Sequence, residues 1–204
     1  MPELRWYQDG ALAAWAAAGH RGVVVLPTGA GKTIVAIAAM ARLGLPSLCL
    51  VPTRILMAQW CKTIAAFCDK EPGRIGDGEH RVAPITVATY ASAISWAPRI
   101  GNRFGLVVVD EAHHVGAECP REVLEMLVAP ARLGLSATPP LGDAADAMEC
   151  AIGAVVYSLG IDDLVGDALA EFDLISIPIR LTPEERARYQ LLRSRFSAAY
   201  TAFQ

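Results

Sequence analysis

The sequence Leu26-Pro27-Thr28-Gly29-Ala30-Gly31-Lys32-Thr33 separates an apolar run at residues 22–26 from an apolar, Ala-rich segment at residues 33–43. We expect a buried strand before this turn and a buried helix after it. A glycine-rich turn in that position points backbone N–H groups and the positive helix end at a phosphate. Lys32 adds a charge for the outer phosphates, and the Thr33 hydroxyl can ligate Mg²⁺. The stretch, residues 26–33, therefore predicts a phosphate-binding loop, called the phosphate loop below.

Leu26 departs from the usual pattern of such loops, which has a further glycine at that position. Gly29 and Gly31 remain, and they supply the backbone freedom that a tight turn needs. On this stretch alone, an ordinary strand-to-helix turn with a chance lysine stays a possible interpretation. Residues elsewhere in the chain distinguish a phosphate-binding loop from such a turn.

The composition is that of a globular α/β protein. The chain has 204 residues, of which 53% are hydrophobic, enough for one domain or slightly more. No apolar run approaches the length of a membrane span, and the N-terminus lacks a signal-peptide pattern, so we expect a cytoplasmic protein without a membrane partner. Five cysteines without a Cys-x-x-Cys pair favour buried free thiols over disulfides or zinc. The net charge of −3 excludes a broad basic surface, so any contact with nucleic acid should be local.

Apolar strands alternate with helices along the first 140 residues. Beyond the phosphate loop, the pattern predicts helices at 4–18, 54–67 and 121–127 and strands at 47–51, 84–88, 106–109 and 131–135. Asp77-Gly78 marks a hairpin-type turn, and a loop is expected through Pro98 and Gly101. Leu56, Trp60, Ile64 and Phe67 recur at helical spacing and indicate a core stripe on the helix at 54–67. Continuous apolar strands of this kind favour a mostly parallel sheet with helices on both faces.

The organisation loosens after Pro140. We expect a helix at 143–151, a strand at 155–157 and a helix at 162–169, and residues 172–181 read as an edge strand or an extended linker. Thr182-Pro183-Glu184-Glu185 is a capping box with proline at the first helical position. The helix that it opens carries apolar residues on one side, which either pack on this domain or dock onto material that follows.

Two clusters of polar residues lie at the carboxyl ends of strands in the predicted sheet. Asp110 and Glu111 follow the strand at 106–109, where Asp110 is suited to hold Mg²⁺ and Glu111 to orient an attacking water. Ser136 and Thr138 follow the strand at 131–135, where simple helix capping is the alternative interpretation. Because ligands collect at the carboxyl ends of parallel strands, we expect both clusters to lie beside the phosphate loop. His113 and His114 lack the spacing of a helical zinc motif.

The chain resembles a known family at these residues, the superfamily two helicases and translocases with DEAH-type boxes. The matching stretches occur in the family's order, and they are 29–33, Val51-Pro52-Thr53-Arg54, Val87-Ala88-Thr89-Tyr90, Asp110-Glu111-Ala112-His113 and Ser136-Ala137-Thr138. Within that family, residues 4–8, 85–90, 102–106 and 181–186 look most like XPB-type DNA helicases.

The resemblance implies a RecA-like P-loop NTPase lobe at residues 1–160 and an extension at 161–204 that leads toward a second lobe. It implies ATP and Mg²⁺ as cofactors and DNA as a partner. The residues that it assigns to ATP are Arg5 and Gln8 at the adenine, Thr28, Gly29, Ala30, Gly31, Lys32 and Thr33 at the phosphates, and Asp110 with Thr33 at the metal. Lys32, Asp110, Glu111 and His113 would be catalytic, and His113, Ser136 and Thr138 would couple ATP to lobe movement. Pro52, Thr53, Arg54, Thr89 and Tyr90 would lie along one DNA strand.

Two departures from the family pattern qualify these expectations. Leu141-Gly142-Asp143 stands where the XPB branch has an Arg-Glu-Asp element, which puts a strand-opening role in doubt. The Gln-x-x-Gly-Arg-x-x-Arg segment that supplies arginine fingers does not occur in these 204 residues. We therefore expect one lobe of a longer protein, which binds nucleotide but hydrolyses it poorly. The alternatives are the motor portion of an ATP-dependent restriction nuclease and a non-enzymatic, nucleotide-dependent DNA-binding module.

Overall fold

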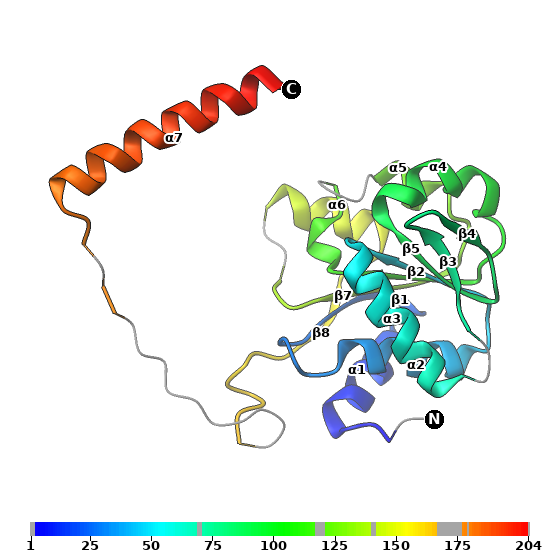
Figure 1. Ribbon diagram of the computed structural model, residues 1–204. Helices are drawn as coiled ribbons and strands as arrows, with labels where there is room; N and C mark the ends of the chain where they lie inside the picture. The colour runs from blue at the N-terminus through cyan, green and yellow to red at the C-terminus, as the bar shows by residue number, and fades with distance from the viewer. Residues whose placement is uncertain are drawn as a thin grey trace. The chain divides into compact units, whose positions relative to one another are not determined.

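The structure, a computed structural model, describes residues 3–68, 71–116, 121–139, 142–166, 177–178 and 180–203 (Figure 1). The chain forms two compact units, residues 1–170 and residues 171–204. The first unit holds the sheet and every residue of the predicted site. The second unit contains one described helix, α7 (Pro183–Phe203).

Eight strands of the first unit form one sheet in the order β4-β3-β5-β2-β6-β7-β1-β8. The strands are β1 (Arg21–Val25), β2 (Ser47–Val51), β3 (Gly73–Gly76), β4 (Glu79–Arg81), β5 (Ile85–Thr89), β6 (Leu106–Asp110), β7 (Ala131–Ser136) and β8 (Val155–Ser158). β4 pairs antiparallel with β3, and all other neighbours are parallel. The predicted mostly parallel sheet is confirmed.

Helices cover both faces of this sheet (Figure 1). α1 (Trp6–Ala17), α2 (Lys32–Leu43) and α3 (Arg54–Phe67) pack on one face, and α4 (Tyr90–Ile100), α5 (Arg121–Glu125) and α6 (Asp143–Ala151) pack on the other. Within β6, Val108 faces the first layer while Val107 and Val109 face the second. The central strands β2 and β6 are buried on both faces, which explains why they are apolar rather than alternating, whereas the edge strand β4 is exposed and polar.

Most predicted elements are present within one or two residues of their expected ends. The Asp77-Gly78 turn joins β3 to β4, with φ of 53° and 80° at its two residues, as an Asp-Gly hairpin turn requires. Thr53 caps α3, because its side-chain oxygen accepts a hydrogen bond from the Leu56 N–H at 3.2 Å. Trp60 and Ile64 of the predicted stripe are buried, but Phe67 at the end of α3 is 44% exposed, so its assignment to the core is wrong.

The prediction of a loop through Pro98 is also wrong, since α4 continues to Ile100. Thr89 caps this helix by accepting the Ser92 N–H at 3.3 Å. Its buried side includes the small residues Ala93 and Ala97, which give a weak periodic signal in the sequence. Pro98 lies in the last turn, where the missing N–H costs a single helical hydrogen bond.

The region after β8 differs from its prediction as well. Residues 162–166 of the helix expected at 162–169 form turns, and the remainder of that segment lies outside the described residues. Leu164 is fully buried in the core that α1 and α2 share, and the first compact unit ends at residue 170. A domain boundary at residue 160 stays a prediction. Most of the expected strand or linker at 172–181 also lies outside the described residues; residues 177, 178, 180 and 181 are not in a strand.

The capping box that opens α7 is present in full. The Thr182 N–H donates to Glu185 Oε2 at 2.9 Å, and the Glu185 N–H donates to Thr182 Oγ1 at 3.2 Å. Among the described cysteines, Cys49 and Cys61 are buried free thiols as expected, whereas Cys150 is exposed. None of the helices in the described part of the chain is long and apolar enough to cross a membrane.

Candidate nucleotide-binding site

Three neighbouring strands, β6, β7 and β1, bring the predicted clusters together at one edge of the sheet. The phosphate loop follows β1, and its first residue, Leu26, donates its N–H to the Ser136 carbonyl at the end of β7 at 3.0 Å. Asp110, the last residue of β6, is in register with Leu135 of β7. The expected meeting of the loop, Asp110 and Ser136 is therefore confirmed by the strand order.

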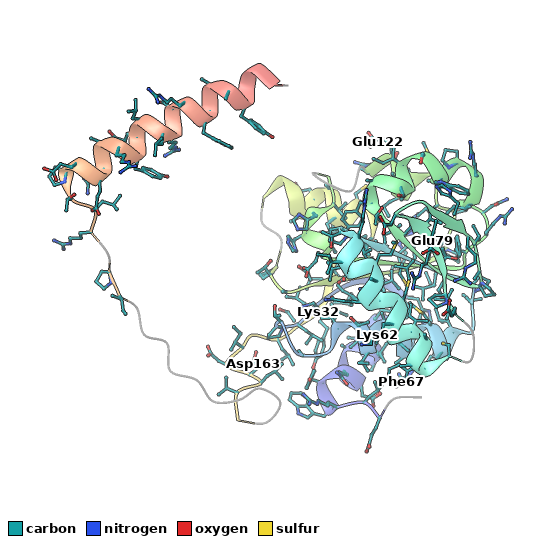
Figure 2. The ribbon with its side chains drawn as sticks, in the orientation of Figure 1. Lys32, Lys62, Phe67, Glu79, Glu122 and Asp163 are labelled. Carbon is teal, nitrogen blue, oxygen red and sulfur yellow. The ribbon has the colours of Figure 1, made fainter. Side chains whose placement is uncertain are left out.

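The backbone of the phosphate loop has the conformation of a phosphate cradle. Gly29 and Gly31 both have positive φ, at 86° and 78°, and Gly31 is the N-cap of α2. Leu26, by contrast, is fully buried in the core and does not have positive φ, which explains why this position does not need glycine. Lys32 begins α2, and its Nζ donates to the Leu26 carbonyl at 3.2 Å, which places the ammonium across the loop (Figure 2).

Helix α1 braces the phosphate loop through one carbonyl. Tyr7 Oη and Gln8 Nε2 both donate to the Ala30 carbonyl, each at 3.0 Å. Gln8 Oε1 accepts the Arg5 N–H at 3.0 Å, and Arg5 Nη1 donates to Tyr7 Oη at 3.2 Å. Beside this network lies a pocket of about 240 Å³, lined by Glu3, Arg5, Gln8, Gly29, Ala30, Gly31 and Ile34. The structure thus places both residues predicted at the adenine next to the loop.

Asp110 is nearly buried and held by two hydrogen bonds. Trp60 Nε1 donates to its Oδ2 at 2.7 Å, and the Glu111 N–H donates to its Oδ1 at 3.1 Å. Burial raises the pKa of this carboxyl above its ordinary value, while the Trp60 hydrogen bond opposes the rise and the Glu111 charge adds to it. The Lys32 charge opposes the rise in the pKa of Asp110 as well, but by less than burial raises it.

Glu111 has a left-handed backbone, with φ of 50° and ψ of 52°, which is uncommon for a residue with a side chain. The Tyr90 hydroxyl donates to the Asp110 carbonyl and lies 3.5 Å from the Glu111 carbonyl, so it holds the backbone on both sides of this residue. Strained residues of this kind persist where their surroundings fix them and are common at functional sites. The first residue of α4 therefore contacts the backbone on both sides of Glu111.

His113 and Ser136 link the turn after β6 to the end of β7. His113 Nδ1 lies 3.0 Å from Ser136 Oγ and 3.5 Å from Glu111 Oε2. Ser136 Oγ also donates to the Thr138 carbonyl at 2.6 Å, while the Thr138 N–H lies 3.3 Å from the same oxygen. The three residues expected to couple nucleotide state to movement are thus in one hydrogen-bonded chain.

The residues predicted to contact DNA lie at the ends of β2 and β5, next to the nucleotide half of the edge. Pro52 is half-buried, and Thr53 and Arg54 are exposed. Thr89 and Tyr90, however, are only 6% and 2% exposed, and both side chains are used inside the lobe. The Tyr90 ring is buried and its hydroxyl donates to the Asp110 carbonyl, so its side chain has a partner inside the lobe. Contact of Thr89 and Tyr90 with DNA stays a prediction.

Two residues of the site were not predicted as such. Tyr7 holds the Ala30 carbonyl, and Trp60, assigned only to the core, holds Asp110. The available signal was chemical rather than periodic, because a buried Tyr or Trp needs a partner for its polar atom. A larger cavity of about 350 Å³ lies at the opposite edge, lined by apolar residues such as Ile37, Leu45 and Phe67, and contains none of the predicted site residues.

A glycine-rich loop that opens a helix, beside a carboxylate pair on a neighbouring strand, defines this unit as a P-loop nucleotide-binding lobe. The donor set fits a Mg²⁺–nucleotide, because a hydroxyl and a carboxylate are oxygen ligands that Mg²⁺ accepts. The chain belongs to the family described as "Type III restriction enzyme, res subunit", which matches residues 1–141.

Curated relatives support the expected helicase resemblance. The chain is 39% identical over 194 residues to "DNA 3'-5' translocase XPB2" of Sulfurisphaera tokodaii, covering 95% of this chain and 44% of that protein. It is 33% identical to "DNA 3'-5' helicase XPB" of Mycobacterium tuberculosis, covering 92% of this chain and 36% of that protein. The chain therefore spans less than half the length of either relative.

Solved structures agree with the fold. The helicase domain of Pyrococcus furiosus Hef matches 76% of this chain with a TM-score of 0.63 and 25% identity, over 37% of its own length. The Type ISP restriction-modification enzyme LlaGI, in complex with a DNA substrate mimic, matches 79% of this chain with a TM-score of 0.57 at 19% identity, which shows the fold alone. The predicted RecA-like helicase lobe and the likeness to XPB-type proteins are confirmed.

Proposed function

We propose that this chain is the ATP-binding lobe of an ATP-dependent DNA helicase or translocase, which works together with a second RecA-like lobe. The observation that carries the proposal is the convergence of the phosphate loop, Asp110 and the His113–Ser136 pair on three adjacent strand ends. The 39% identity to a DNA translocase over 95% of the chain supports the same assignment. Hydrolysis needs charge neutralisation that this lobe shares with a partner, since arginine fingers contribute about 10³–10⁵ in rate in related enzymes.

In this proposal Lys32 and the loop N–H groups hold the outer phosphates of ATP, and Thr33 with Asp110 holds Mg²⁺. When bound, the metal neutralises phosphate charge. Glu111 orients the attacking water, and its side chain is partly exposed beside His113. Within the lobe, Gln8 Oε1 accepts one hydrogen bond and Gln8 Nε2 donates one. The amide therefore keeps a second lone pair and a second N–H for a ligand. An amide with one donor and one acceptor matches the N6 and N7 edge of adenine.

For DNA, the proposal uses the exposed start of α3. Arg54 Nη1 pairs with Asp77 Oδ1 at 3.0 Å, with side chains 74% and 58% exposed. Such an exposed pair contributes little to stability, so a phosphate can replace Asp77 at small cost. The Thr53 side chain and the α3 N-terminus lie beside it, and both favour an anion.

The motor portion of a restriction enzyme is a second candidate function. The family description favours it. The relatives named XPB2 and XPB nevertheless match more than nine tenths of this chain, whereas the family match ends at residue 141. We therefore prefer a helicase or translocase. Nuclease activity of the longer protein that contains this lobe would reverse the preference.

Nucleotide binding tests the proposed site directly. Titration of the 204-residue chain with a fluorescent ATP analogue and Mg²⁺ should give saturable binding, reduced at least tenfold by Lys32→Ala. Lys62→Ala is the matched control, because Lys62 is an exposed lysine on α3 (Figure 2). In the protein with both lobes, Glu111→Gln should abolish DNA-stimulated turnover and leave ATP binding intact. Equal binding by the Lys32 and Lys62 variants would refute the assignment.

The DNA contact has its own test. Arg54→Ala should weaken binding of single-stranded DNA and reduce the salt dependence by about one released counterion. Arg42→Ala is the control, because Arg42 forms a similar exposed pair with Asp9, between α2 and α1. If both variants bind DNA like the unmodified protein at several salt concentrations, the proposed DNA contact of Arg54 is refuted.

A further inference from the structure

Trp60 brings the polar end of a core side chain to the carboxylate predicted to hold the metal. Its indole N–H donates to Asp110 Oδ2 at 2.7 Å, and the two side chains are only 2% and 6% exposed. The other carboxylate oxygen accepts the N–H of Glu111, the next residue. One oxygen is therefore fixed by the turn itself and the other by helix α3.

A buried tryptophan whose N–H has a hydrogen-bond partner is common, and Trp15 is an example in this chain with a purely structural role. Trp15 is also 2% exposed, and its Nε1 donates to the Arg132 carbonyl at 2.9 Å. That acceptor belongs to the backbone near the start of β7, at the edge away from the phosphate loop. The acceptor of Trp60 is instead a side chain that can rotate and carry charge, so this hydrogen bond sets an orientation.

We propose that Trp60 is a positioning residue for Asp110, whose carboxylate it holds in the orientation that binds the Mg²⁺ of the nucleotide. The inference rests on the proposed function, and Trp60 itself contacts neither nucleotide nor metal. It also assigns α3 a mechanical role. The helix begins at Arg54, about 9 Å along its axis from Trp60, and so connects the predicted DNA edge to the metal ligand.

The test compares nucleotide affinity with and without Mg²⁺ in the 204-residue chain. Trp60→Phe removes the donor and should reduce the gain in affinity that Mg²⁺ gives by about tenfold. The affinity in EDTA should stay unchanged, because the phosphate loop does not depend on this hydrogen bond. Trp15→Phe, which loses an equally buried N–H away from the site, should leave both affinities unchanged.

Trp60→Phe also leaves a smaller ring in the core, so a second variant separates shape from the hydrogen bond. Benzothienylalanine at position 60 has sulfur in place of the N–H and nearly the same volume. The Mg²⁺-dependent gain should fall in this variant too. If it is retained, the proposal is overturned whatever the phenylalanine variant shows. If Lys32→Ala has no effect on nucleotide binding, the proposed function is refuted. The inference about Trp60 then fails too, because it rests on that function.

Fluorine NMR of the chain labelled with fluorotryptophan gives a readout that does not depend on affinity. The resonance missing from Trp60→Phe identifies Trp60, and the one missing from Trp15→Phe identifies Trp15. Adding Mg²⁺ to the nucleotide-bound chain should shift the Trp60 resonance and leave that of Trp15 in place. If the Trp60 resonance does not move, metal binding does not alter the environment of the Trp60 ring through Asp110, and the proposal is wrong.

Discussion

Gly31 of the phosphate loop combines a left-handed backbone with a close side-chain neighbour. Its φ is 78°, and a Cβ atom there would lie 2.6 Å from Gln8 Nε2. Gly31→Ala should lower the free energy of unfolding by about 1–2 kcal/mol, because an L-residue pays that cost in the left-handed region. It should also weaken nucleotide binding, since it displaces the amide that braces the loop. Thermal unfolding and ATP titration measure the two effects.

Gly44 provides the control for that substitution. It ends α2 with φ of 63°, and nothing lies within 4 Å of its would-be Cβ. Gly44→Ala should therefore cost a similar amount of stability without changing nucleotide affinity. Equal affinities for the two alanine variants would mean that the approach of Gln8 to Gly31 has no role in binding.

Single residues also show the limit of prediction from sequence. The phosphate loop, Asp110 and Ser136 were predictable because each follows an apolar strand, and parallel strands end at one edge. The roles of Trp60 and Tyr90 were not. Helical spacing indicates that a side chain is buried but does not identify the partner of its polar atom, and here both partners are atoms of Asp110, the last residue of β6.

At the level of elements, the helices with clear end signals were predicted best. α2 ends at Gly44 and α3 begins at a threonine cap, and both appear where expected. α4 was missed because two of its four buried residues are alanine and its last turn holds Pro98. The helix expected at 162–169 failed over 162–166, where Leu164 packs in the core from a turn rather than from a helical face.

The capping box of α7 leads to a prediction about that helix. Thr182→Ala removes the acceptor for the Glu185 N–H, which should destabilise the first turn by about 1 kcal/mol. Amide hydrogen exchange in that turn should become several times faster. Glu184→Ala is the control, because Glu184 lies in the same turn outside the reciprocal pair. Equal acceleration by both variants would show that the effect is not specific to the cap.

At the scale of the whole molecule, one edge of one sheet divides into two halves. β6, β7 and β1 carry the nucleotide site, and β5 and β2 carry the start of α4 and the exposed start of α3. The halves meet at Asp110, whose side chain is held from α3 and whose carbonyl is held from α4. A lobe that couples ATP to DNA movement needs such a junction, because coupling requires an element that both ligands bias.

The extent of the first unit gives the last prediction. All described site residues and both hydrophobic cores lie within residues 3–166, so a chain ending at Ala170 should bind nucleotide and unfold like the full chain. A chain ending at Gly160 loses Leu164, which is fully buried. Losing a buried leucine costs about 2–5 kcal/mol, so its melting temperature should fall by about 5–15 °C. Equal melting of the two shortened chains would place the boundary at 160, and weaker nucleotide binding by the longer one would show that residues 171–204 contribute to the site.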